Sequence, residues 1–168
     1  MIAEILGFFG NNPILSLVIL TFLPFLELRA SIPYGILVLQ ESWILVFVVC
    51  VMANIVLVPF IYLFVNHLMN VFIKVKFIDH IYQKVVGKTQ KKVHPYVEKW
   101  GKLGLALFIS IPLPGSGVYS GGIGAYLLGF KFKDYLIASI IGVLIAGIAM
   151  TVISIFGNEA LGFFIKVI

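Results

Sequence analysis

Two uninterrupted apolar stretches constrain this chain more than any other feature of its sequence. Residues 43–65 and 135–156 contain no charged side chain, and each is long enough to cross about 30 Å of hydrocarbon at about 1.5 Å per residue. Trp43 and Tyr135, at their starts, are suited to membrane interfaces. With 61% hydrophobic and only 11% charged residues, the chain lacks the charged surface of a soluble domain. The sequence therefore predicts an all-α integral membrane protein, a single membrane domain over residues 1–168, with both stretches as transmembrane helices.

Two further apolar stretches, residues 13–40 and 103–130, are interrupted at their centres. The first contains Pro24 and Pro33, and the second contains the segment PLPGSGVYSGG. Proline removes a backbone donor and glycine weakens a helix, so a straight span through either centre is costly. Each flank is about half a bilayer long. We therefore expect two re-entrant helical hairpins, which are tolerated at membrane depth where protein or a polar cavity surrounds them.

The lysines predict how these segments cross the membrane. Eight of the twelve cations lie between residues 74 and 102, as is typical of a cytoplasmic loop. Lys102 precedes the second hairpin, and Lys131 and Lys133 follow it, so both its ends are expected on the cytoplasmic side. The chain then divides into two inverted repeats, each a re-entrant hairpin followed by a transmembrane helix. Many secondary transporters place a binding site near the midplane between such repeats.

The central segment, residues 66–101, has apolar and cationic side chains on opposite sides at helical spacing. This pattern predicts a cytoplasmic amphipathic helix on the inner leaflet, bent near Pro95, with its cations facing anionic headgroups. Nucleic-acid binding is the less favoured alternative for such a basic segment. We expect a multi-pass protein of the cell (inner or plasma) membrane with membrane lipids as its partners.

Two charged residues mark the first hairpin as a candidate site. Glu27 and Arg29 are the only charged residues between Glu4 and Glu41, and an ionisable side chain at membrane depth is a candidate for function because it is costly there. Arginine offers a planar fork for phosphate or carboxylate. Burial favours the neutral form of a carboxyl group, which makes Glu27 the candidate proton carrier. The alternative is that the two side chains only neutralise each other and hold the hairpin.

The second hairpin offers backbone groups instead of charges. Its prolines should stop the first helical arm, and its glycines and serines should leave backbone N–H groups at the start of the second arm, where an anion is favoured. The alternative is that these small residues only allow close packing. In the first transmembrane helix, Asn54 either hydrogen-bonds a neighbouring helix, which is the favoured role, or lines a cavity. The candidate substrate- and proton-binding residues are therefore Glu27, Arg29, Ser31, Pro33, Asn54, Pro112, Pro114, Gly115, Ser116 and Gly117.

The motifs ELRASIPYGI and PLPGSGVYSGGIGAYLLG resemble the paired signatures of the small multidrug export family, a relative of the DedA/VTT membrane proteins. The resemblance covers nearly the whole chain and implies two re-entrant hairpins with spanning helices. It also implies that Glu27 and Arg29 are the acidic and basic residues of the first hairpin motif. DedA relatives move polyprenyl phosphate or phospholipid, often with proton dependence. They usually carry arginine in the second hairpin region, and residues 103–130 of this chain contain none.

These features favour a transporter or flippase of an anionic amphiphile, such as a polyprenyl phosphate or phospholipid, with Arg29 holding the headgroup and Glu27 carrying a proton. The alternative is a proton-coupled exporter of small cationic drugs, in which Glu27 binds the cargo and Arg29 releases it. An enzyme is not expected, because PGSGVYSG has neither the arginine nor the acidic cluster of a lipid pyrophosphatase. We expect no cofactor and no metal. Four membrane-embedded elements are few for a complete pathway, which favours a homodimer.

Overall fold

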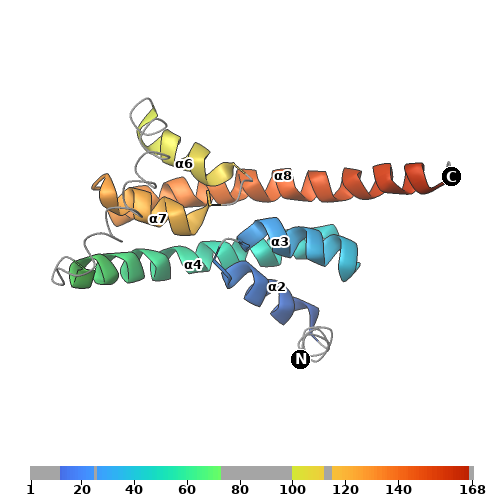
Figure 1. Cartoon of the computed structure of the whole chain (residues 1–168), viewed down its shortest axis with the longest axis horizontal. Coiled ribbons are helices and arrows are strands. Elements are labelled where there is room, and N and C mark those ends of the chain that lie inside the picture. The colour runs from blue at the N-terminus through green and yellow to red at the C-terminus, as the bar shows by residue number, and fades with distance from the viewer. Residues whose placement is uncertain (1–11, 25, 73–99, 112–114, 167–168) are drawn as a thin grey trace. The chain divides into compact units, whose positions relative to one another are not determined.

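The computed structural model describes residues 12–24, 26–72, 100–111 and 115–166. All regular structure within these residues is helical, as predicted, and consists of six α-helices and one π-helical turn without any strand (Figure 1). The elements are α2 (Pro13–Phe22), α3 (Glu27–Pro33), η1 (Tyr34–Val38), α4 (Trp43–Phe72), α6 (Lys102–Ser110), α7 (Val118–Leu127) and α8 (Phe132–Lys166).

The long helices α4 and α8 contain both predicted transmembrane stretches. Their segments Trp43–His67, of 25 residues, and Phe132–Gly157, of 26 residues, are long and apolar enough to cross a membrane. Both helices extend beyond the predicted ends; Pro59, inside α4, and Gly157, inside α8, do not end their helices. α4 therefore continues into the predicted amphipathic segment. The rest of that segment up to residue 99, with the expected bend near Pro95, lies outside the described residues.

The chain folds into two compact units. The first unit comprises residues 1–54 and 145–168, and the second unit comprises residues 55–144. Each unit therefore contains one interrupted hairpin together with one part of α4 and one part of α8. This shared content agrees with a repeated architecture, while the inverted orientation of the repeats stays a prediction.

In the first unit, the break between the two hairpin arms lies beside Pro24, one of the two prolines expected to interrupt the segment. α2 ends at Phe22 and α3 begins at Glu27, and in the turn between them the N–H groups of Leu26 and Glu27 both donate to the carbonyl of Leu23. The prediction that Pro33 interrupts the segment is wrong. Pro33 is the last residue of α3, and the chain continues directly into the π-helical turn η1. Proline has no backbone N–H to donate to the preceding turn, and the wider π turn lets the helix continue past it.

The first unit is packed most tightly around Gly35 of η1. A Cβ atom at this position would lie 2.7 Å from Val46 of α4 and 2.9 Å from Leu17 of α2. Real Cβ atoms do not approach other atoms this closely, so a larger residue would separate the elements. Gly35 therefore lets η1 approach both α2 and the first turn of α4 closely.

The second unit has a comparable close approach between α6 and α8. A Cβ atom at Gly142 would lie 2.7 Å from the Cβ of Ile109 and 2.8 Å from the carbonyl oxygen of Ala106. Small residues at such a contact let two helices approach closely. At the other end of α6, Lys102 forms an ion pair with Asp134 in the first turn of α8. The two ends of the second hairpin therefore meet.

Candidate functional site

Glu27 lies in an unusual backbone conformation at the start of α3. Its φ of 42° is in the left-handed region, which a residue other than glycine rarely adopts and which costs free energy. The residue is also 4% exposed, so its carboxylate is buried. Strained residues of this kind persist where the surrounding structure fixes them and are concentrated at functional sites.

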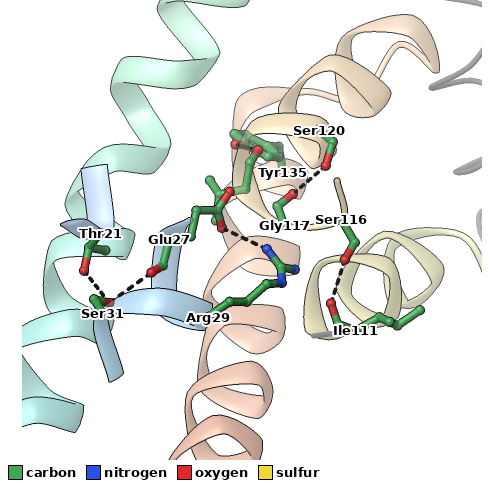
Figure 2. A network of polar contacts seen from close by, with 10 residues as sticks. Thr21, Glu27, Arg29, Ser31, Ile111, Ser116, Gly117, Ser120 and Tyr135 are labelled. Carbon is green, nitrogen blue, oxygen red and sulfur yellow. Dashed lines mark hydrogen bonds and ion pairs between the residues drawn. The ribbon is translucent and has the colours of Figure 1, made fainter. Parts of the chain in front are cut away.

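Arg29 is the partner of Glu27 in an ion pair. Arg29 Nη1 lies 3.9 Å from Glu27 Oε2, with the two side chains 12% and 5% exposed (Figure 2). Side chains two residues apart in a regular helix do not face each other, and the left-handed backbone of Glu27 is what makes this pair possible. The contact is long compared with a charge-assisted hydrogen bond of about 2.8 Å. The expected neutralisation is present, but the pair is loose.

Two buried hydroxyl groups fix the turn that carries Glu27. The Ser31 hydroxyl donates to the carbonyl of Glu27 at 3.0 Å. The Oγ1 of Thr21 lies 2.8 Å from the Oγ of Ser31 and 2.7 Å from the carbonyl of Leu17, and its single hydrogen can serve either acceptor (Figure 2). Ser31 was predicted to bind substrate or a proton. In the structure its hydroxyl bonds the backbone of Glu27, which makes it a positioning residue for the carboxylate.

The polar face of α4 continues this buried region. The thiol of Cys50 interacts with the hydroxyl groups of Thr21 and Ser31, and Cys50 is fully buried. Asn54, one helical turn further along α4, is also 0% exposed. Neither its Oδ1 nor its Nδ2 has a hydrogen-bond partner within the described part of the chain. The helix–helix hydrogen bond expected of Asn54 is therefore absent there.

In the second unit, the described part of PLPGSGVYSGG forms a tight turn before α7. Gly115 and Gly117 have φ values of 82° and 123°, a region that favours glycine. The Ser116 hydroxyl donates to the carbonyl of Ile111 at 2.6 Å, and Ser120 lies 3.5 Å from the carbonyl of Gly117. The serines therefore bond the backbone of the turn itself (Figure 2). The two remaining predicted site residues, Pro112 and Pro114, lie outside the described residues.

Tyr135 of α8 is the residue of the second unit whose role sequence reasoning missed. It was expected near a membrane interface, yet it is 0% exposed, and its hydroxyl donates to the carbonyl of Val118 at 2.8 Å. Its ring stacks on Tyr62 of α4 at 6.0 Å between centroids. Tyr135 thus fixes the first residue of α7. The neighbouring pair Gly121 and Gly122 was the available signal, because paired glycines make room for a large side chain.

The chemistry of the two hairpins therefore differs. Among the described residues, Glu27 is the only buried carboxylate, and it has a guanidinium within reach. The described serines of the second hairpin bond the backbone through their hydroxyl groups. No group of three His, Cys, Asp or Glu side chains that could hold a metal ion occurs in the described part of the chain. A buried carboxylate beside hydroxyls can hold a proton or one positively charged group.

One family model matches the chain. It is described as "Putative small multi-drug export protein" and matches residues 27–149, so the match begins at Glu27 and covers both hairpin motifs from that residue onward. No curated protein and no solved structure matches the chain.

Proposed function

The chain belongs to the family of small multi-drug export proteins, and from this membership we propose that it exports small amphiphilic cations, with Glu27 as the cation-binding group. Membership and the two long apolar helices support a membrane transporter. Beyond membrane transport, we propose that the cargo is positively charged and that Glu27 holds it.

The buried carboxylate of Glu27 is the observation that carries this proposal. Placing an ionised side chain among apolar helices costs free energy unless a positive charge offsets it. Arg29 supplies that charge through a contact of 3.9 Å. A cationic cargo could therefore replace Arg29 at the carboxylate without breaking a strong bidentate pair.

Competition for one carboxylate gives the transporter a simple cycle. When a cation binds Glu27, the Arg29 guanidinium is displaced; when the cation leaves, Arg29 returns to the carboxylate. A proton on Glu27 would release either partner, because the neutral acid attracts a cation much less than the carboxylate does. Proton coupling then follows from the fact that cargo, Arg29 and a proton all use the same oxygen atoms.

An anionic amphiphile, the substrate that the sequence motifs favour, has less support. The family description names drug export, and the DedA relationship rests on the resemblance of two motifs. Residues 103–130 supply no cation, which leaves Arg29 as the one fixed positive charge for a lipid phosphate in either hairpin. Lipid flipping therefore becomes an outcome of the test.

The proposal includes the arrangement in the membrane. Two re-entrant hairpins in inverted repeats would face each other, with the basic segment in the cytoplasm and the chain acting as a homodimer in the cell membrane. The ion pair between Lys102 and Asp134 supports a hairpin whose two ends lie on one side.

Transport by the reconstituted protein tests the proposal. Proteoliposomes with an imposed pH gradient should take up the fluorescent cation ethidium, and Glu27→Gln should abolish this uptake. Glu41→Gln is the matched control, because it makes the same chemical change at a partly exposed carboxylate of the same unit, and it should transport normally. Equal uptake by wild type and Glu27→Gln would overturn the proposal. So would flipping of a labelled polyprenyl phosphate that Arg29→Gln abolishes while no cation is moved.

A further inference from the structure

The packing of the first hairpin against α4 follows a regular antiparallel register. Gly35 packs against Val46, and one helical turn back along the hairpin Ser31 interacts with Cys50, one turn further along α4. Residues four apart on a helix lie on the same face, one turn from each other. The next step in this register pairs Glu27 with Asn54. This register places the two residues at the same level of the first unit.

Asn54 is the polar group at this level whose hydrogen bonding is not used. A side-chain amide has two donor hydrogens and an acceptor oxygen, and in the described part of the chain neither polar atom of Asn54 has a partner, although the residue is 0% exposed. The nearby hydroxyls of Thr21 and Ser31 differ, because both have partners within the unit. Leaving an amide buried and unpaired costs free energy, and each such group in a folded protein requires an explanation.

We propose that Asn54 determines the specificity of the site: its Oδ1 accepts a hydrogen bond from an N–H of the cation that Glu27 holds. This inference rests on the proposed function, because it needs Glu27 to bind the positive charge. The carboxylate accepts one N–H of a protonated amine, and the amide oxygen accepts a second N–H of the same head group. A site built to hydrogen-bond a donor rejects the analogue that lacks it. The cargo class is therefore protonated primary amines, in preference to tertiary amines that have a single N–H.

A pair of cations that differ only in this donor tests the inference. Two dansyl-labelled alkylammonium probes would be used at pH 7, one with a primary ammonium head that has three N–H groups and the other with a dimethylammonium head that has one, which the carboxylate uses. Binding to the purified full-length protein in detergent gives a Kd for each probe. Wild type should bind the primary ammonium probe more tightly, by about tenfold to a hundredfold, which is the effect of one hydrogen bond to a charged group.

Substitution of Asn54 should remove this preference. In Asn54→Leu the ratio of the two Kd values should fall to about one. Asn54→Ala, which is smaller than the native residue, makes the same test without added bulk. Ser139→Ala is the matched control. Like Asn54, Ser139 lies on a long helix and is fully buried, and its hydroxyl has no hydrogen-bond partner among the described residues. Its Kd ratio should equal that of wild type.

The outcomes separate this inference from the proposed function. If wild type binds both probes equally and Glu27→Gln binds neither, the specificity role of Asn54 is wrong and cation binding at Glu27 stands. A preference that survives in both Asn54 variants also overturns the inference, and would mean that the amide holds a structural water. If wild type binds neither probe, the proposed function fails and the inference fails with it.

Discussion

The first and second units follow one plan with different chemistry. In each unit a glycine of the second hairpin arm lies against the fourth residue of a long helix: Gly35 against Val46 of α4, and Gly122 against Tyr135 of α8. The first unit then buries the ion pair of Glu27 and Arg29. The second unit instead fixes its hairpin through hydrogen bonds from neutral hydroxyl groups to backbone carbonyls.

This difference teaches that the packing plan does not set the chemistry of the site. Close helix packing needs only small residues at a few contacts, and both units have them. A buried charge needs, in addition, an oppositely charged partner and a backbone conformation that directs the side chain toward that partner. Among the described residues, only the first unit has both. We therefore expect the first unit to depend on electrostatics and the second unit to depend on packing.

Arg29→Ala should have the largest effect on stability. It leaves the buried carboxylate of Glu27 without its positive partner, and removing one member of a buried pair costs about 3 to 5 kcal/mol. The free energy of unfolding in mixed micelles, measured by denaturant titration, would show this loss. Combining Arg29→Ala with Glu27→Gln should recover a large part of it, because no unpaired charge then remains. If the double variant were as unstable as the single one, the first unit would not depend on its charge.

Gly142→Ala should destabilise the second unit by about 2 to 3 kcal/mol, as overpacking does in a tight core. The added Cβ would meet the backbone carbonyl of Ala106 at 2.8 Å, and a backbone atom in a helix cannot move aside. Gly35→Ala in the first unit should cost less, about 1 to 2 kcal/mol, because its new Cβ meets only the ends of side chains. The same denaturant titration gives both values.

The control for both glycine variants is Gly157→Ala. A Cβ at Gly157 of α8 would meet nothing within 4 Å among the described atoms, and alanine is the better helix former. This variant should therefore be as stable as wild type or slightly more stable. A cost at Gly35 as large as that at Gly142 would mean that the two units tolerate overpacking equally.

Tyr135→Phe and Ser31→Ala should each cost about 1 kcal/mol of stability, because each removes one buried hydrogen bond to a backbone carbonyl. Their effects on function should differ. Ser31 holds the carbonyl of Glu27, so its loss should weaken ethidium binding. Tyr135 lies in the second unit, which has no buried charge among its described residues, so its loss should leave the Kd for ethidium unchanged. Equal effects on the Kd would show that the two units are not separate in function.

Lys102→Ala should have the smallest effect, at most about 1 kcal/mol, because the Lys102 side chain of this ion pair is 59% exposed and exposed pairs contribute little. The effect should disappear at high salt, which screens exposed charges. Lys133→Ala removes an exposed lysine nearby and is the matched control. A loss well above 1 kcal/mol that persists at high salt would mean that the ends of the second hairpin depend on charge, contrary to the contrast between the units.

The long helices and the interrupted hairpins were predictable because hydropathy and helix breaking are local properties. The start of α4 at Trp43 coincides with the predicted span. Glu27 and Arg29 were found for the same reason, since a charge in an apolar stretch is visible without any knowledge of its neighbours. The position of the hairpin break was less predictable, because Pro24 and Pro33 have the same local chemistry and the surrounding packing decided between them.

The sequence by itself thus determined which segments are helical and apolar, where they are interrupted, and that a carboxylate and a guanidinium lie at one interruption. Only the tertiary structure decided that Glu27 takes a left-handed backbone, that Tyr135 is buried against α7, and that Asn54 is buried with its amide unpaired among the described residues. The physical reason is that burial and register arise from contacts between residues far apart in the chain. Such contacts leave no periodic pattern in the sequence near either of the two residues.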